Sequence, residues 1–171
     1  MAKFKPFFEV ELSKEYSPDE RRAIAAEIID LVITRTENGI DASGRNFVKY
    51  SKKYAEEKGQ ANVDLTFSGD MLAELKLVQE RSGLVRIGYH SDDEVVGKVE
   101  GNVLGTYGQE KPVTKGRNFL GITAKDLKSI LSNYPIGDKE KRSERVSDIA
   151  SADIIARDII SRSGFDGEDS E

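Results

Sequence analysis

One stretch organises the chain, and it reads Gly39-Ile-Asp-Ala-Ser-Gly-Arg-Asn-Phe47-Val-Lys-Tyr50-Ser-Lys-Lys-Tyr54-Ala-Glu-Glu-Lys58-Gly59. Glycines at positions 39, 44 and 59 are typical of turns. The aromatic residues Phe47, Tyr50 and Tyr54 succeed one another at intervals of three and four residues. On a helix this spacing places the three rings on one face. The stretch therefore predicts a glycine-bearing loop that leads into a short helix.

The residues around this helix predict its two ends and the elements after it. Ser51 can cap its first turn, and Gly59 can end it in the left-handed conformation that glycine accepts. The run Val63–Thr66 is apolar and β-branched enough to be extended. Ser68 can then cap another helix over Gly69–Leu75. None of these residues forms a catalytic motif.

The order of these residues carries a family resemblance. The pattern is Gly-x-Asp-x-x-Gly-x-x-Phe-x-x-Tyr-Ser-x-x-Tyr-Ala-x-x-Lys-Gly, followed by Val-Asp-Leu-Thr-x-Ser-Gly-x-Met-Leu. It resembles the tailed-bacteriophage virion morphogenesis and tail-completion proteins, which are small structural proteins of the phage neck or tail end. A later segment, Arg117-Asn-Phe119-Leu120-Gly121-Ile122, resembles the Arg-x-Phe-Leu-Gly segment of the same family.

The resemblance implies a structural role without catalysis and without a cofactor. Relatives form a closed ring, commonly six-fold, that completes the head-proximal end of the tail and joins the tail to the head. The expected partners are other copies of the chain, the tail tube protein and head-side neck or connector proteins, with phage DNA passing through. The expected location is the virion neck or tail end, and the host cytoplasm during assembly.

These patterns single out two sets of residues. The first set is expected to form the framework of the fold: Phe47, Tyr50, Tyr54, Leu65, Met71, Phe119 and Leu120. The second set is expected to contact neighbouring subunits from loops and from the C-terminal region: Asp41, Arg45, Lys111, Lys115, Arg117, Ile154, Ile155 and Ile159.

Length, composition and charge narrow the possible classes of protein. The chain has 171 residues and no cysteine, so disulfides and thiolate chemistry are excluded. No apolar run approaches the roughly 20 residues that a membrane-spanning helix needs, and we expect no membrane partner. Between 137 and 171 there are ten acidic and six basic residues, a balance of -4 that leaves -1 of the total -5 for the rest. A near-neutral body with an acidic tail disfavours a dedicated binder of phosphate backbones.

Hydrophobic periodicity predicts an α+β fold: a small, mostly antiparallel sheet, one long helix packed on it, shorter peripheral helices and a C-terminal helical extension. The long helix is the most distinct, because Ser17 and Glu20 form a capping box around Pro18. The other expected elements are a strand over 8–12, a hairpin pairing 77–78 with 85–87, helices over 91–102 and 124–131, and a short strand over 118–122.

The chain divides by composition into one domain and an appendage. Residues 1–135 form the α+β domain, and 136–148 are densely charged, which predicts a solvated linker. Isoleucines recur over 149–163 and predict a C-terminal helix, which either folds back on the domain or docks on a neighbouring subunit. The acidic residues 164–171 predict a mobile tail.

Two functions of other classes compete with the structural one. Lysines interleaved with tyrosines over Lys49–Lys58, and a second basic loop over Lys111–Arg117, could bind nucleic acid by charge and stacking. The alternative for the first cluster is that its tyrosines pack inward while the lysines stay solvated. An enzyme would have to use His90, the only histidine, and no nucleophile motif accompanies it. We therefore interpret His90 as an exposed turn residue.

Overall fold

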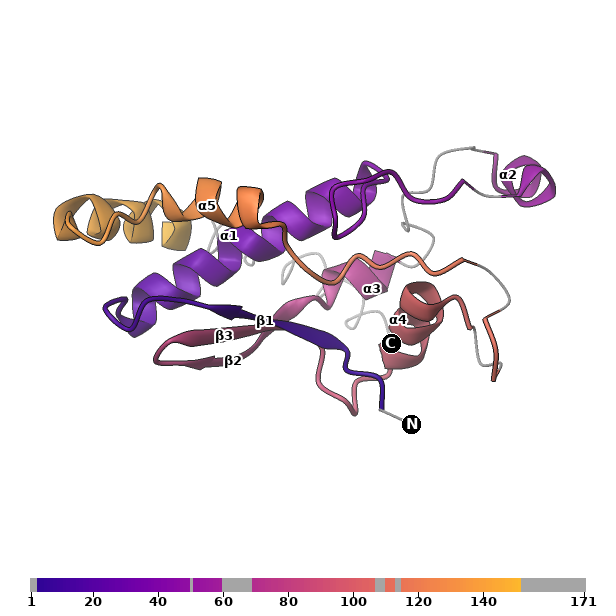
Figure 1. The fold of residues 1–171 in the computed structure, drawn as a ribbon, viewed down its shortest axis with the longest axis horizontal. Helices are drawn as coiled ribbons and strands as arrows, with labels where there is room; N and C mark the ends of the chain where they lie inside the picture. The colour runs from indigo at the N-terminus through magenta and orange to yellow at the C-terminus, as the bar shows by residue number, and fades with distance from the viewer. Residues whose placement is uncertain (1–2, 50, 60–68, 107–109, 113–114, 152–171) are drawn as a thin grey trace, which may run out of the picture.

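The structure is a computed structural model, and it describes residues 3–49, 51–59, 69–106, 110–112 and 115–151. The elements are β1 (Phe7–Glu11), α1 (Pro18–Glu37), α2 (Lys52–Lys58), α3 (Gly69–Ala73), β2 (Lys76–Arg81), β3 (Leu84–Gly88), α4 (Val96–Leu104) and α5 (Ala124–Leu131). A further helix is described over 139–151. The expected α+β fold is confirmed (Figure 1).

The sheet has three antiparallel strands in the order β1-β3-β2. β2 and β3 form the predicted hairpin, with Leu77 paired to Ile87, and β1 pairs on the other edge of β3 with Val10 opposite Val85. Gly83 turns the hairpin at φ 83°, a conformation that glycine adopts without the steric penalty of a side chain. Val85 and Ile87 of the central strand β3 are fully buried in the core.

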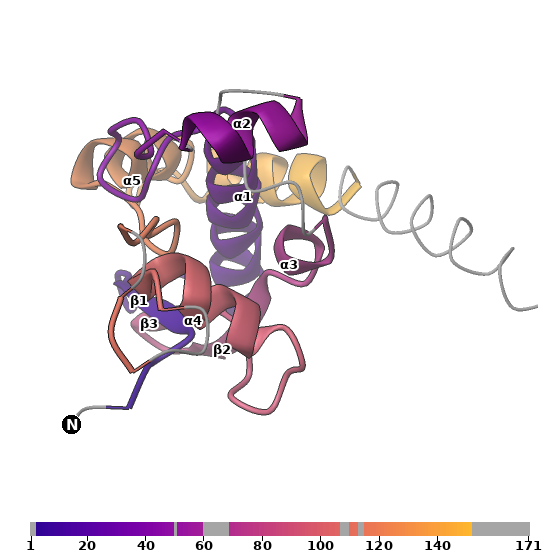
Figure 2. The same cartoon turned by 90° about the vertical axis from the view of Figure 1, so that its right-hand side faces the viewer.

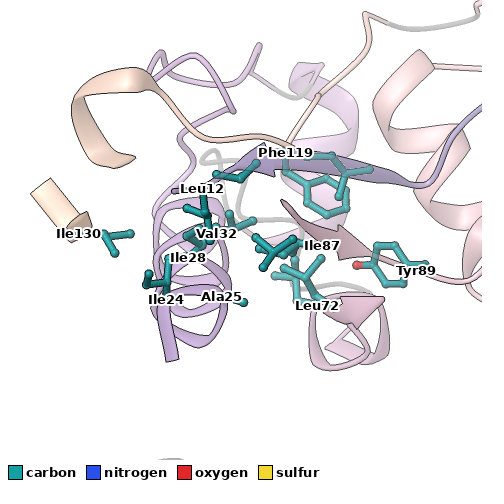
Figure 3. Packing of buried hydrophobic residues seen from close by; sticks show 14 of the residues in the cluster. Leu12, Ile24, Ala25, Ile28, Val32, Leu72, Ile87, Tyr89, Phe119 and Ile130 are labelled. Carbon is teal, nitrogen blue, oxygen red and sulfur yellow. The ribbon is translucent and has the colours of Figure 1, made fainter. Parts of the chain in front are cut away.

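The long helix α1 begins as its sequence predicts. The Ser17 side chain accepts a hydrogen bond from the Glu20 backbone N–H, and the Glu20 carboxylate accepts one from the Ser17 backbone N–H at 2.9 Å. α1 then crosses the sheet, where Ile28 and Val32 are fully buried in the common core (Figure 3). The expected packing of the long helix on the sheet is thus confirmed.

A second layer covers α1 on the side away from the sheet, and only part of it was expected from the sequence. α5 and the helix over 139–151 lie there, so α1 is enclosed from two directions (Figures 1 and 2). The expected solvated linker over 136–148 is therefore wrong from residue 139 onward. Arg142, in the middle of that stretch, is buried at 7% exposure, because Glu20 of α1 supplies its counter-charge. Residues 152–163 of the expected C-terminal helix, and the tail 164–171, lie outside the described residues.

The expected strand over 118–122 is also wrong, and a buried arginine explains why. Arg35, at the end of α1, donates Nη2 hydrogen bonds to the carbonyls of Phe119 and Gly121. Both carbonyls thus have a side-chain donor where a strand would offer a neighbouring backbone N–H. Gly121 adopts φ 150° at this place. The segment thus packs its apolar side chains into the core as an irregular chain.

Helix α4 begins five residues later than the expected helix over 91–102. The Asp93 carboxylate accepts a hydrogen bond from the His90 backbone N–H at 2.8 Å and pairs with Lys76 of β2 at 2.9 Å. These contacts hold residues 90–93 as a turn. The acidic residues Asp92, Asp93 and Glu94, which lie within the expected range, therefore precede the helix, and its first turn contains none.

Candidate interaction surfaces

Side chains that could bind a metal ion do not gather among the described residues. Among them, no group of three histidine, cysteine, aspartate or glutamate side chains is placed to hold a metal ion. His90 is exposed at the turn before α4, as the sequence indicated. No described helix is both long enough and apolar enough to cross a membrane. The features that remain are surfaces: a loop, a basic segment, a projecting helix and a groove.

The first surface is the loop after α1, which its own hydrogen bonds make rigid. The Asp41 carboxylate accepts from the Ser43 backbone N–H at 2.9 Å, the Ser43 hydroxyl at 2.6 Å and the Arg45 backbone N–H at 3.0 Å. Partial burial alone would raise the pKa of Asp41, but these hydrogen bonds outweigh it and lower the pKa. Arg45 stays exposed at the tip. Asp41 therefore shapes the loop, and Arg45 is the candidate contact residue.

The second surface is the basic segment over Lys111–Arg117, and its three basic residues differ. Lys111 and Lys115 are exposed. Arg117 is buried at 8% exposure, and its Nε donates to the Val48 carbonyl at 3.3 Å. Its backbone N–H bonds to the Asn102 carbonyl at 2.6 Å. Arg117 thus ties the segment to the body, which contradicts its expected role as a subunit contact.

The third surface is helix α2, which projects beyond the C-terminal end of α1 (Figures 1 and 2). The predicted caps are confirmed: the Ser51 hydroxyl accepts from the Tyr54 backbone N–H at 3.3 Å, and Gly59 ends the helix at φ 78°. α2 makes no extensive contact with another described helix or strand. We call residues 51–59 the α2 arm.

Tyr54 is 39% exposed on the α2 arm, next to the exposed lysines Lys52 and Lys53. The interpretation in which the tyrosines pack inward is therefore wrong for Tyr54. The common helical face expected for Phe47 and Tyr54 is wrong too, because Phe47 precedes the helix. Phe47 is buried instead, at 6% exposure, and fixes the chain just before the arm. A buried aromatic side chain thus precedes the arm, and an exposed one lies on it.

The fourth surface is a groove of about 310 Å³ between α1 and the helix over 139–151. Small and branched apolar side chains line it, and one acid and one base lie at its edge. The lining residues are Asp19, Arg22, Ala23, Ala26, Val146, Ile149 and Ala150. This groove was not predicted from the sequence, because the preceding charged run was interpreted as solvated.

The remaining framework residues divide into buried ones and undescribed ones. Met71 and Phe119 are fully buried, and Leu120 is 8% exposed, so all three lie in the core as expected. Tyr50 and Leu65 lie outside the described residues. The three interface candidates of the C-terminal region do too: Ile154, Ile155 and Ile159.

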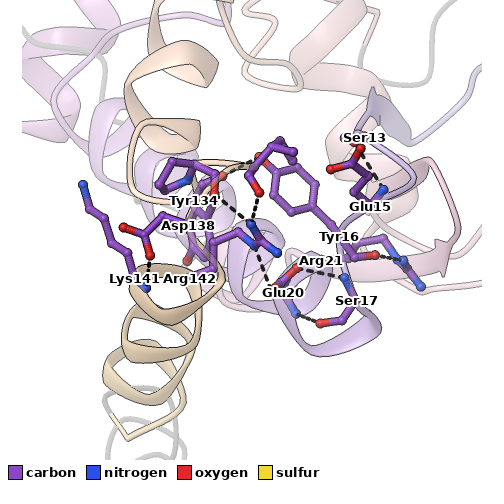
Figure 4. Close-up of polar contacts among 12 residues, drawn as sticks. Ser13, Glu15, Tyr16, Ser17, Glu20, Arg21, Tyr134, Asp138, Lys141 and Arg142 are labelled. Carbon is purple, nitrogen blue, oxygen red and sulfur yellow. Dashed lines mark hydrogen bonds and ion pairs between the residues drawn. The ribbon is translucent and has the colours of Figure 1, made fainter.

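A polar network that was not predicted from the sequence holds the helix over 139–151 in place (Figure 4). The Arg142 Nε donates to the Glu20 carboxylate at 3.0 Å, and its Nη1 donates to the Pro135 carbonyl at 2.8 Å. One turn later Arg145 pairs with Glu27, which also accepts the Tyr134 hydroxyl. These contacts fasten the helix over 139–151 to α1, the two helices between which the groove lies.

Comparisons with known proteins find no relative of this chain. No protein-family model matches the chain, and no curated protein or solved structure shows significant similarity to it.

Proposed function

We propose that the protein is a structural component of a tailed-phage virion. In this proposal, copies of the chain form a ring at the head-proximal end of the tail, complete the tail and join it to the head. The observation that carries the proposal is the α2 arm. A helix that leaves its own body, with an exposed aromatic residue at 39% exposure, has the form of a contact element for another subunit.

Elementary symmetry supports a ring built from such an arm. When an arm on one face of a subunit binds a different face of the next, the interface is heterologous, and it closes into a ring if the rotation permits. Tyrosine is enriched at protein interfaces because it contributes a large apolar area together with one hydroxyl. The rigid Asp41 loop lies close to the base of the arm in sequence, and exposed Arg45 adds a charge there.

A second candidate, nucleic-acid binding, draws support from the same exposed tyrosine. Lys52 and Lys53 directly precede Tyr54 in the sequence, and bases can stack on an aromatic ring that lies beside cations. Glu56 and Glu57 follow on the same short helix and reduce its positive charge. Binding of this kind would weaken steeply with salt. We favour the structural role because the charge of α2 is nearly balanced.

Gene deletion with plasmid complementation tests the proposal in a phage that encodes this chain. Without the gene, we expect lysates that contain DNA-filled heads beside unattached tails in negative stain, and the wild-type plasmid should restore plaques. A plasmid with Tyr54→Ala should restore at least tenfold fewer plaques, while Glu57→Ala, a change on the same exposed helix, should match the wild type. Normal particles from the deletion strain would contradict the proposal.

A further inference from the structure

The groove between α1 and the helix over 139–151 leaves apolar side chains only partly covered. Val146 and Ile149 pack against the core yet remain partly exposed along it. Ala23 and Ala26 form the α1 side, and their small side chains make room for side chains from elsewhere. A volume of about 310 Å³ is at the lower end of the range of binding clefts. It therefore suits a few branched side chains rather than a whole domain.

We infer that the groove of one copy receives the isoleucine segment, residues 154–160, of a second copy. This segment reads Ile154-Ile155-Ala-Arg157-Asp158-Ile159-Ile160. One isoleucine pair precedes the charged pair and one follows it. The groove offers the matching pattern, with an apolar floor and the exposed ion pair Asp19–Arg22 at its edge. Arg157 can face Asp19 while Asp158 faces Arg22, so both charges would be paired.

The length of chain after the groove favours a second copy over the segment's own chain. The groove ends at Ala150, and the isoleucines begin at Ile154, only a few residues later. To enter its own groove, the chain would have to reverse direction within those residues. Of the residues that favour turns, this stretch offers Ser151 and Asp153 but neither glycine nor proline before Gly164. The groove of a neighbouring copy requires no such reversal.

This contact is heterologous, since the groove of one copy binds a different part of the next copy. It rests on the proposed ring for its subunit-to-subunit arrangement, and it supplies the ring with a second contact besides the α2 arm. Each isoleucine pair that is buried in the groove stabilises the contact between the two copies, because its apolar surface is removed from water. The exposed charges contribute mainly to the register of the segment, because surface ion pairs add little stability.

Disulfide trapping in the full-length protein tests the inference, since the chain has no cysteine of its own. Ala26→Cys is made in one preparation and Ile155→Cys in another, and the two are mixed and oxidised. We expect a disulfide-linked dimer that contains one chain of each variant. The matched control replaces Ala26→Cys with Asp148→Cys, an exposed position beside the groove that does not line it, and should give at least tenfold less dimer.

Charge exchange gives a second readout within the same assay. Asp19→Arg in the groove variant should lower the dimer yield by up to about fivefold, as expected for an exposed ion pair. Arg157→Asp in the partner variant should then restore the yield. Recovery of this kind requires that the two positions meet, which a loss of folding would not produce.

Two outcomes would overturn the inference. One is a chain carrying both Ala26→Cys and Ile155→Cys that closes a disulfide within itself while the mixed variants form no dimer. The other is no disulfide in either format. If the mixed dimer forms but deletion of the gene leaves phage tails attached, the subunit contact stands and the proposed location in the virion fails.

Discussion

At the scale of single residues, one carboxylate joins the start of the fold to its end. Glu20 accepts from the Ser17 backbone N–H with one oxygen and from the Arg142 guanidinium with the other. The side chains of Glu20 and Arg142 are only 7% and 9% exposed. A buried charge that loses its partner keeps its desolvation penalty without compensation. The two residues are 122 positions apart, so this pair closes a long loop.

The first prediction concerns this pair. Arg142→Ala should lower the free energy of unfolding by about 3 kcal/mol, the scale for breaking one partner of a buried ion pair. Lys141→Ala, its exposed neighbour, should change it by less than about 0.5 kcal/mol, as surface substitutions do. Urea denaturation followed by circular dichroism measures both. Equal stability of the two variants would show that Arg142 is solvated.

The second prediction concerns two buried tyrosines. Burial raises the pKa of Tyr89 well above its ordinary value, and burial together with the Glu27 carboxylate raises the pKa of Tyr134. The unfolded chain loses these protons near pH 10 while the folded chain keeps them. The unfolded state then binds fewer protons, so the contribution of these two hydroxyls to the free energy of unfolding should be constant below about pH 9 and fall as the pH rises beyond 10.

Spectrophotometric titration near the phenolate absorption band checks this prediction. The two hydroxyls should ionise together with unfolding, in one cooperative step. A double variant with Tyr89→Phe and Tyr134→Phe should lack the part of the absorbance change that these two hydroxyls produce. Gradual ionisation of both groups in the folded protein near pH 10 would contradict the assigned burial.

At the scale of elements, the helix over 139–151 marks the boundary of what could be predicted from the sequence. Its mixed charges are typical of a solvated linker. Arg142, Arg145, Val146 and Ile149 nevertheless recur at the spacing of one helical face. Two of these four residues are charged, so a search for apolar periodicity finds no signal. Their partners, Glu20 and Glu27, are on α1, and no local pattern in the sequence indicates that contact.

Elements that depend on residues nearby in the sequence could be predicted, whereas those that depend on contacts with distant residues could not. Ser17 and Ser51 cap the helices that they were expected to cap, because each hydroxyl bonds to a backbone N–H three residues later. The segment over 118–122 failed as a strand because Arg35, far away in the chain, holds its carbonyls. Of the candidate surfaces, the Asp41 loop and the α2 arm had local signals in the sequence, whereas the groove required two distant helices.

The third prediction concerns how much the helix over 139–151 contributes to the stability of the fold. Ser143 is exposed within it, so a substitution there acts through the backbone. Ser143→Pro should lower the free energy of unfolding by about 3 kcal/mol, because proline removes a helical hydrogen bond and clashes with the preceding turn. Ser143→Ala should leave the stability unchanged or slightly higher. Equal stability of the proline and alanine variants would mean that the helix contributes nothing to the fold.

The fourth prediction contrasts two glycines. A Cβ at Gly88, at the end of β3, would lie 2.3 Å from the Pro6 carbonyl oxygen and 2.5 Å from the Phe7 Cα. Gly88→Ala should therefore displace β1 and destabilise the protein by more than about 2 kcal/mol, the range for strain and overpacking. Gly97 in α4 has open space, so Gly97→Ala should stabilise by up to about 1 kcal/mol through helix propensity. Thermal unfolding of both variants checks the opposite signs.

At the scale of the whole molecule, a layered body carries two features directed outward. α1 lies between the sheet on one side and α5 with the helix over 139–151 on the other (Figure 1). The α2 arm projects at one end of α1, and the groove lies along the N-terminal half of the same helix. A subunit with separate contact features at the two ends of one long helix suits a head-to-tail assembly. This arrangement underlies the proposed ring.

Locating the protein in purified particles tests the proposed role most directly. An affinity tag at the N-terminus, labelled with gold, is imaged on intact virions of a phage that encodes the chain. We predict that the label gathers at the junction of head and tail, and that detached tails keep it at one end only. Purified infectious particles that lack the protein, or a label spread along the tail or over the head, would contradict this role.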